Sequence, residues 1–262
     1  MGDEDFKDQR RIATNYVLSG GKIKVAMVHL SNACPNKCSQ CYRSADLKQN
    51  IISTKDAEKL VLGIKQDGYQ VLVEMAELFS KTRHLLPIYK LAGNIELSTS
   101  GEYLLTNPDV FDDLRKNNIT KPRISLYHKN VHEAWTHRKR HRAVKAIEKC
   151  LEENFEVSAN YIVSKSTLPF LSEYCDEIEK IGAKKIVLLN YTALGKGKDL
   201  SSEVLSNKEL DHFFNMFKQL KEEYKGRINF EKLGTFGPGL QELRHQTLNE
   251  LVNLEKFCWA GL

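Results

Sequence analysis

The sequence predicts an α/β protein built from repeated strand–helix units. Short apolar runs of about four to eight residues alternate with longer segments in which apolar residues recur at helical spacing. This alternation occurs six times in succession, which predicts parallel strands joined by right-handed crossovers. Periodicity alone does not separate an open doubly wound sheet from a barrel, but both arrangements place functional side chains at the carboxyl ends of the strands.

The individual elements follow from this pattern and from local signals at their ends. Strands are expected at residues 24–30, 70–73, 94–98, 122–127, 155–163 and 185–190, with a seventh at 228–233. Helices are expected at residues 53–65, 81–91, 108–117, 140–154, 168–181 and 207–224, and a last one follows a glycine turn at 237–239. Ser53 or Thr54 caps the first helix, Asn107 and Pro108 open the third, and Gly182 ends the fifth.

The composition is that of a globular protein. The 262 residues carry a net charge of +5, from 39 basic and 34 acidic side chains, which is too small an excess to predict a nucleic-acid partner. No apolar run approaches the roughly 20 residues of a membrane helix, and the charged first residues lack the apolar core of a secretory signal. We therefore expect a cytoplasmic protein, in which six reduced cysteines point to metal binding or catalysis rather than to disulfides.

Three of the six cysteines lie within eight residues, directly after the first predicted strand. Cys34, Cys38 and Cys41 have the spacing C-x3-C-x2-C. Three thiolates can hold three irons of a cubane cluster and leave the fourth iron open to a ligand. Structural zinc usually takes four ligands, and no second paired set follows here, because His84 and His128 lie on other predicted units. The spacing favours an iron–sulfur cluster over structural zinc or an inert role.

This cysteine motif after strand one, followed by repeating strand–helix units, resembles the radical S-adenosylmethionine (radical SAM) superfamily over about residues 20–200. The resemblance implies an α/β fold, a partial (β/α)6 TIM-like barrel at 20–200 with a short C-terminal helical extension at 201–262. It implies a [4Fe–4S] cluster on Cys34, Cys38 and Cys41 that reductively cleaves SAM to a 5′-deoxyadenosyl radical, which abstracts a hydrogen atom from a substrate. The alternative is a non-catalytic iron–sulfur or zinc protein that uses the cysteines structurally or for electron transfer.

The resemblance also implies a set of SAM contacts at the strand ends: Glu77, Ser98, Ser100, Ser125, Arg138, Asn160 and Leu189. Glu77 matches the glutamate of the family's Gly-Gly-Glu motif, although Met75 and Ala76 replace both glycines. Ser125 and Asn160 have a structural alternative, because each could satisfy backbone groups at a strand end. Arg138, the expected partner of the SAM carboxylate, lies in a basic run at a helix start, where cations are unfavourable unless an anion is near.

The last residues of the sequence bear on the kind of substrate, and the remaining cysteines are expected to have a structural role. Cys258-Trp259-Ala260-Gly261 resembles the Cys-x-Ala-Gly segment that opens SPASM and twitch modules, so 201–262 is interpreted as the start of a truncated module. Because such members often modify peptides, a peptide substrate is favoured over a small molecule, with a reductase or flavodoxin-type protein as electron donor. Cys150 and Cys175 lie on predicted helices and are expected in the core. No residue identifies the substrate or a catalytic side chain.

Overall fold

Strands and helices alternate along the chain in the computed structural model, which describes residues 14–17 and 24–232. The strands are β1 Thr14–Val17, β2 Lys24–Ser31, β3 Tyr69–Met75, β4 Glu96–Thr99, β5 Lys121–Ser125, β6 Ser158–Val163, β7 Lys185–Asn190 and β8 Asn229–Lys232. The helices are α2 Thr54–Gln66, η1 Arg83–Leu85, α3 Leu86–Ala92, α4 Glu102–Thr106, α5 Val110–Lys116, α6 Lys129–Thr136, α7 Arg140–Glu152, η2 Leu168–Phe170, α8 Leu171–Ile181, η3 Gly195–Glu203 and α9 Asn207–Glu223. The predicted turn at 237–239, the last helix and Cys258 lie outside the described residues.

The strands follow one another in space in the order of the sequence. β2 pairs with β3 in parallel, and β4 to β8 form a five-stranded sheet in which every pair is parallel. Between β3 and β4 the backbone pairing is interrupted, and the side chain of Asn94 bridges the gap by accepting from the Val73 amide at 3.2 Å. The expected α/β fold with the strand order of a partial TIM-like barrel is confirmed.

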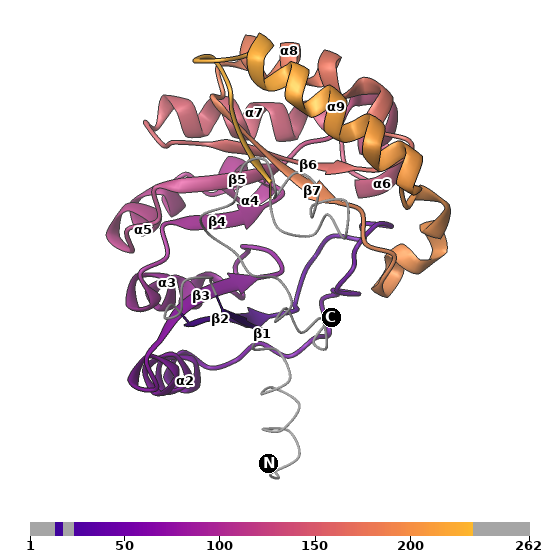
Figure 1. The fold of residues 1–262 in the computed structure, drawn as a ribbon. Helices are drawn as coiled ribbons and strands as arrows, with labels where there is room; N and C mark the ends of the chain where they lie inside the picture. Colours follow the sequence, from indigo (N-terminus) through magenta and orange to yellow (C-terminus); the bar gives the residue numbers. More distant parts are fainter. Residues whose placement is uncertain (1–13, 18–23, 233–262) are drawn as a thin grey trace.

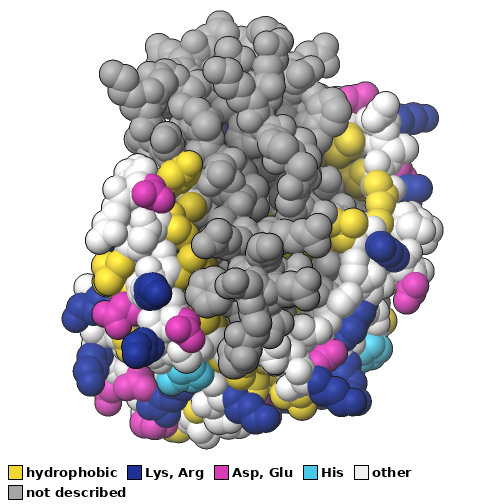
Figure 2. All heavy atoms as spheres, turned by 90° about the horizontal axis from the view of Figure 1, so that it is seen from below, with side chains coloured by type: hydrophobic (Ala, Val, Ile, Leu, Met, Phe, Trp, Pro, Cys, Tyr) yellow, Lys and Arg dark blue, Asp and Glu magenta, His cyan; other side chains and the backbone are white. Residues whose placement is uncertain are grey.

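The helices cover the outer side of the curved sheet, with α2 and α3 beside β3 and α8 and α9 beyond β6 and β7 (Figure 1). Alternate strand residues point toward these helices and form the apolar core, whereas their neighbours point to the opposite side, which we call the inner face. On the described part of the face shown in Figure 2, Lys and Arg side chains are interspersed with Asp and Glu. The nearly balanced composition leads one to expect this mixture.

Several local signals act as expected. The Ser53 hydroxyl accepts from the Asp56 amide at 3.1 Å and caps α2. Ser206 and Glu209, which were not expected from the sequence to cap a helix, form a complete capping box at the start of α9. Gly182 ends α8 with a φ of 90°, in the left-handed region that favours glycine. Within the described residues, no helix combines the length and the apolar composition that crossing a membrane requires.

The predicted cap at Asn107 is wrong. α5 begins at Val110, and the Asn107 side chain donates instead to the carbonyl of Tyr103 at 3.2 Å, at the end of the preceding helix α4. The predicted helix at 81–91 is two segments, η1 and α3, with Pro87 in the first turn of α3, where its missing N–H costs nothing. The elements β1, α4 and α6 were not expected from the sequence.

Candidate active site

The loop after β2 that carries the three cysteines is held by one backbone hydrogen bond within the loop and by two to other segments, α6 and η3. The Cys34 amide donates to the carbonyl of Asp46 at 3.0 Å within the loop. The Ser39 amide, next to Cys38, donates to the carbonyl of Trp135 in α6 at 2.8 Å. The carbonyl of Cys41 accepts from the Lys196 amide in η3 at 3.0 Å. Each cysteine position therefore has its own backbone anchor.

Side chains of the same loop connect it to the carboxyl ends of the sheet. Asn36 donates to the Glu77 carboxylate, just after β3, at 2.7 Å. Gln40 donates to the Tyr127 hydroxyl, just after β5, at 3.5 Å. Together with the contact to Lys196 beyond β7, these bonds place the cysteine loop across the carboxyl ends of the strands. This is where parallel α/β folds carry their functional groups.

The environment of the thiols suits a cationic ligand. Burial, followed by the charge of Glu77, raises the pKa of Cys34 to about 12. Burial, followed by the charge of Cys41, raises the pKa of Cys38 to about 11. Thiolates are therefore unfavourable here unless a bound cation supplies a counter-charge. In the described part of the chain, no three His, Cys, Asp or Glu side chains are already arranged around a metal position.

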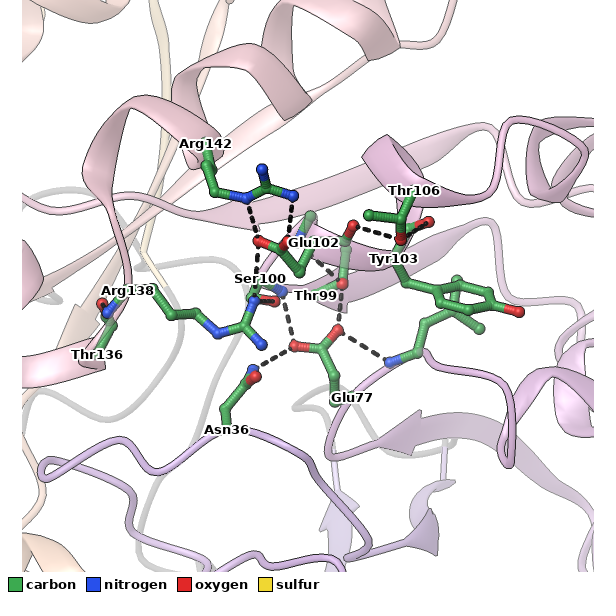
Figure 3. Close-up of polar contacts among 12 residues, drawn as sticks. Asn36, Glu77, Thr99, Ser100, Glu102, Tyr103, Thr106, Thr136, Arg138 and Arg142 are labelled. Atoms are coloured by element: carbon green, nitrogen blue, oxygen red, sulfur yellow. Dashed lines mark hydrogen bonds and ion pairs between the residues drawn. The ribbon is translucent and has the colours of Figure 1, made fainter.

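Glu77 is the polar centre that joins the loop to β3 and β4 (Figure 3). Only 3% of this residue is exposed. Its carboxylate accepts from the Asn36 side chain at 2.7 Å, from the Ser100 amide at 2.9 Å and from the Leu78 amide at 3.0 Å, and the Thr99 hydroxyl donates to it as well. Because protein donors already occupy both carboxylate oxygens, Glu77 holds neighbouring segments in place rather than presenting a free carboxylate.

Two arginines converge beside Ser100 (Figure 3). The Arg138 guanidinium lies 3.3 Å from the Ser100 hydroxyl and 3.2 Å from the Glu102 carboxylate. Arg142 donates to the same carboxylate at 2.8 Å, and this hydrogen bond lowers the pKa of Glu102. Two cations thus share one anion, which leaves positive charge for a further anionic group. An open hollow of about 380 Å³ adjoins them and is lined by Pro35, Asn36, Lys37, Glu102, Thr136, His137, Arg138, Lys139 and Arg142.

The other predicted SAM contacts lie on the inner face of the sheet: Ser98, Ser125, Asn160 and Leu189. The strand neighbour of each belongs to the apolar core beneath the helices: Leu97, Ile124, Tyr161 and Leu188. Because successive side chains in a strand point to opposite faces, the four predicted residues point away from that core. Ser125 and Asn160 are also direct partners in the pairing of β5 with β6. Their roles in binding SAM stay predictions.

Three buried amide oxygens around this region have no hydrogen-bond partner among the described residues: Asn36 Oδ1, Gln40 Oε1 and Asn160 Oδ1. A buried acceptor without a partner is uncommon and unfavourable, so such atoms often mark the place of a ligand or water. Two of these side chains belong to the cysteine loop itself, and the third lies on the inner face of β6. A polar ligand or water between the loop and the inner face would satisfy these oxygens.

The sequence reasoning missed several residues that shape this site, among them Asn36, Gln40, Tyr127 and Lys196. None follows from a periodic pattern, because each acts through a partner far away in the chain. One signal for the segment beyond β7 is visible in the sequence, where Gly195-Lys196-Gly197 forms a glycine-bearing loop shortly after a strand end.

Comparisons with known proteins support the fold. The structure is similar to SuiB of Streptococcus suis bound to precursor peptide SuiA, with a TM-score of 0.68 and 16% identity over 84% of this chain and 51% of that chain. SuiB bound to S-adenosylmethionine matches with a TM-score of 0.64 and 15% identity over 88% and 53%. Native anSMEcpe with bound AdoMet (S-adenosylmethionine) and Cp18Cys peptide matches with a TM-score of 0.60 and 16% identity over 80% and 63%.

At this level of identity the likeness concerns the fold, and this chain spans about half the length of the SuiB chains that it matches. No protein-family model matches the sequence, and no curated protein matches it. The structure is therefore an α/β fold shared with proteins that bind S-adenosylmethionine. The fold that the sequence resemblance implies is therefore confirmed.

Proposed function

We propose that this chain is a radical SAM enzyme in which Cys34, Cys38 and Cys41 hold a [4Fe–4S] cluster. The observation that carries the proposal is the position of the three-cysteine loop across the carboxyl ends of parallel strands. The fold is one in which SuiB and anSMEcpe bind SAM. When bound, a [4Fe–4S] cluster supplies the electron that cleaves SAM.

The chain's own residues bind and orient SAM in this proposal. Arg138 binds the SAM carboxylate in this proposal. Its charge is only partly neutralised, because it shares Glu102 with Arg142, and the Ser100 hydroxyl lies beside it. Ser125 and Asn160 provide polar contacts from the inner face, where the Asn160 oxygen has no partner among the described residues. Ser98 and Leu189 line the same face, with Leu189 near the adenine. Glu77 acts indirectly, by fixing Asn36 and Ser100.

The substrate in this proposal is a peptide. SuiB was solved with precursor peptide SuiA and anSMEcpe with peptide Cp18Cys, which supports a peptide over a small molecule. Electrons come from a reductase or flavodoxin-type protein. A cytoplasmic location belongs to the same proposal, because reduced thiols are needed to assemble the cluster.

The test is anaerobic reconstitution followed by reduction. The protein should bind about four irons, and addition of SAM should change the EPR spectrum of the reduced cluster. With dithionite and excess SAM it should then release 5′-deoxyadenosine, detected by chromatography, while the variant with Cys34, Cys38 and Cys41 replaced by Ala should bind no cluster. Iron binding without 5′-deoxyadenosine above that control would replace this proposal by the non-catalytic iron–sulfur protein, and zinc in place of iron would replace it by the structural zinc protein.

A further inference from the structure

The segment Gly195-Lys196-Gly197, at the start of η3, runs directly against the backbone of the cysteine loop. Gly195 has a φ of +55°, and a Cβ atom placed on it would lie 2.5 Å from the carbonyl oxygen of Tyr42 and 2.8 Å from that of Cys41. Real Cβ atoms do not approach backbone this closely, so only glycine fits. The close approach brings the next residue, Lys196, within hydrogen-bonding reach of the loop.

Lys196 donates to the cysteine loop twice. Its amide donates to the carbonyl of Cys41 at 3.0 Å, and its ammonium group donates to the carbonyl of Ala45 at 2.9 Å. Lys196 is half-buried and Ala45 is buried, so water does not replace the second bond freely. A hydrogen bond from a charged donor is about twice as strong as a neutral one. Lys196 therefore fixes both ends of the stretch from Cys41 to Ala45.

The far end of η3 is fixed to a different part of the sheet. The Glu203 carboxylate accepts from the Ser164 hydroxyl at 2.8 Å and from the Ser166 amide at 2.9 Å, in the connection between β6 and α8. The carbonyl of Glu203 also accepts from the Lys165 amide at 3.1 Å. Because η3 is braced at this end, Lys196 holds the cysteine loop against a fixed support rather than against a free loop.

The geometry points to Lys196 as a positioning residue for the third cluster ligand, an inference that rests on the proposed function. A cubane cluster needs three cysteines whose α-carbons stay at fixed relative positions. Cys34 is anchored within the loop and Ser39, next to Cys38, is anchored on α6. Cys41 is anchored by Lys196, and the donation to Ala45 keeps the chain after Cys41 from moving away. Lys196 holds the backbone at Cys41, which would be the third ligand of the cluster, and does not touch the reacting atoms.

Substitution at Lys196 tests the inference without removing any cluster ligand. Lys196→Met keeps the length of the side chain and removes the ammonium donor. Reconstituted Lys196→Met should lose iron to a chelator roughly tenfold faster than the wild type, or more, because a charged hydrogen bond is lost. The EPR spectrum of its reduced cluster should change. Lys196→Arg should restore most of the wild-type behaviour, because a guanidinium can donate to the same carbonyl.

Lys198→Met is the matched control, since Lys198 is an exposed lysine on the same segment, and it should behave as the wild type. In the metal-free protein, hydrogen–deuterium exchange at residues 41–45 should be faster in Lys196→Met than in Lys198→Met. Equal exchange and equal iron-loss rates in the two variants would overturn the positioning role. A wild-type protein that assembles no iron cluster would instead overturn the proposed function, and the exchange measurement would still decide whether Lys196 anchors the loop.

Discussion

A buried carboxylate is unfavourable unless donors surround it, and Glu77 meets this condition through bonds from Asn36, Leu78, Thr99 and Ser100. In Glu77→Gln, an amide NH2 group would replace one carboxylate oxygen and would face a hydrogen-bond donor. Buried donors would then lack an acceptor. We expect the free energy of unfolding of the metal-free protein to fall by about 1–3 kcal/mol, measured by urea denaturation.

Glu58→Gln is the control, because Glu58 is an exposed carboxylate on α2 and its replacement should change stability by less than about 0.5 kcal/mol. If the two variants unfolded at the same urea concentration, Glu77 would not be the structural centre described here.

Replacement of Arg138 tests whether its positive charge binds the SAM carboxylate. Because Arg142 keeps its own bond to Glu102, Arg138→Ala should leave α4 and α7 in contact while removing the cation proposed for the SAM carboxylate. A charge-assisted contact contributes about 1.5–3 kcal/mol, so SAM affinity should fall roughly ten- to a hundredfold. Calorimetric titration of the cluster-loaded protein measures this change.

The matched variant is Arg115→Ala, which removes an arginine paired with Asp112 and Glu153 on the surface. It should bind SAM as the wild type does. An unchanged affinity in Arg138→Ala would assign the carboxylate to another cation.

Among the elements, those with strong local signals could be predicted and those held by distant contacts could not. β7 and α9 lie at or within one residue of their expected bounds, because a continuous apolar strand and apolar residues at helical spacing are visible in the sequence. β1 is four residues long and depends on pairing with β2. α6 has only eight residues, too few for a stable isolated helix, and its Val131 and Trp135 are buried against the rest of the protein.

The same distinction applies to the site. The cysteines and the strand-end residues Ser125 and Asn160 could be predicted to lie together, because parallel strands bring their carboxyl ends to one edge. The role of Glu77 as a junction could not, since it depends on partners 41 residues back and 23 residues ahead in the chain. The Lys196 anchor is more distant still, joining residues 151 positions apart.

α9 offers a test of stability at the scale of one element. Ser206 accepts from the Glu209 amide, and Glu209 accepts from the Ser206 amide and hydroxyl. Ser206→Ala should lower the free energy of unfolding by about 0.5–2 kcal/mol, measured by thermal or urea denaturation. Ser202→Ala, on the exposed part of η3, should leave stability nearly unchanged. Iron binding should be the same in both variants, because neither substitution changes a predicted cluster ligand or Lys196. A loss of iron in Ser206→Ala alone would contradict this separation.

In the whole molecule, the two sides of the sheet have opposite characters. The outer side is an apolar core, whereas the inner face carries an ion-pair network that spans β4, β5, β7 and β8 through Glu96, Arg123, Lys185 and Glu231. Arg123 lies two residues before Ser125 in β5, so this network is about 7 Å along the strand from the predicted SAM contacts. Along the inner face, the ion-pair network therefore comes first, the predicted SAM contacts follow it, and the cysteine loop lies at the carboxyl ends of the strands.

The cysteines of the whole chain divide into two groups that can be separated by experiment. Cys150 and Cys175 are completely buried on the core side of α7 and α8, and burial raises the pKa of each to about 12. A thiol enclosed by apolar helices cannot reach a cluster on the opposite side of the sheet. Cys150→Ala and Cys175→Ala should therefore keep about four irons per chain after reconstitution, although each should lose some stability through the small cavity that it creates.

Cys34→Ala, Cys38→Ala and Cys41→Ala should each lose most of the iron and the brown absorbance, because a cubane cluster held by three thiolates has no spare protein ligand in this loop. The measurement is iron and sulfide content together with the visible spectrum, taken on variants that show the same helix content by circular dichroism. Full iron content in any of these three variants, or its loss in Cys150→Ala, would show that the cluster is held elsewhere in the chain.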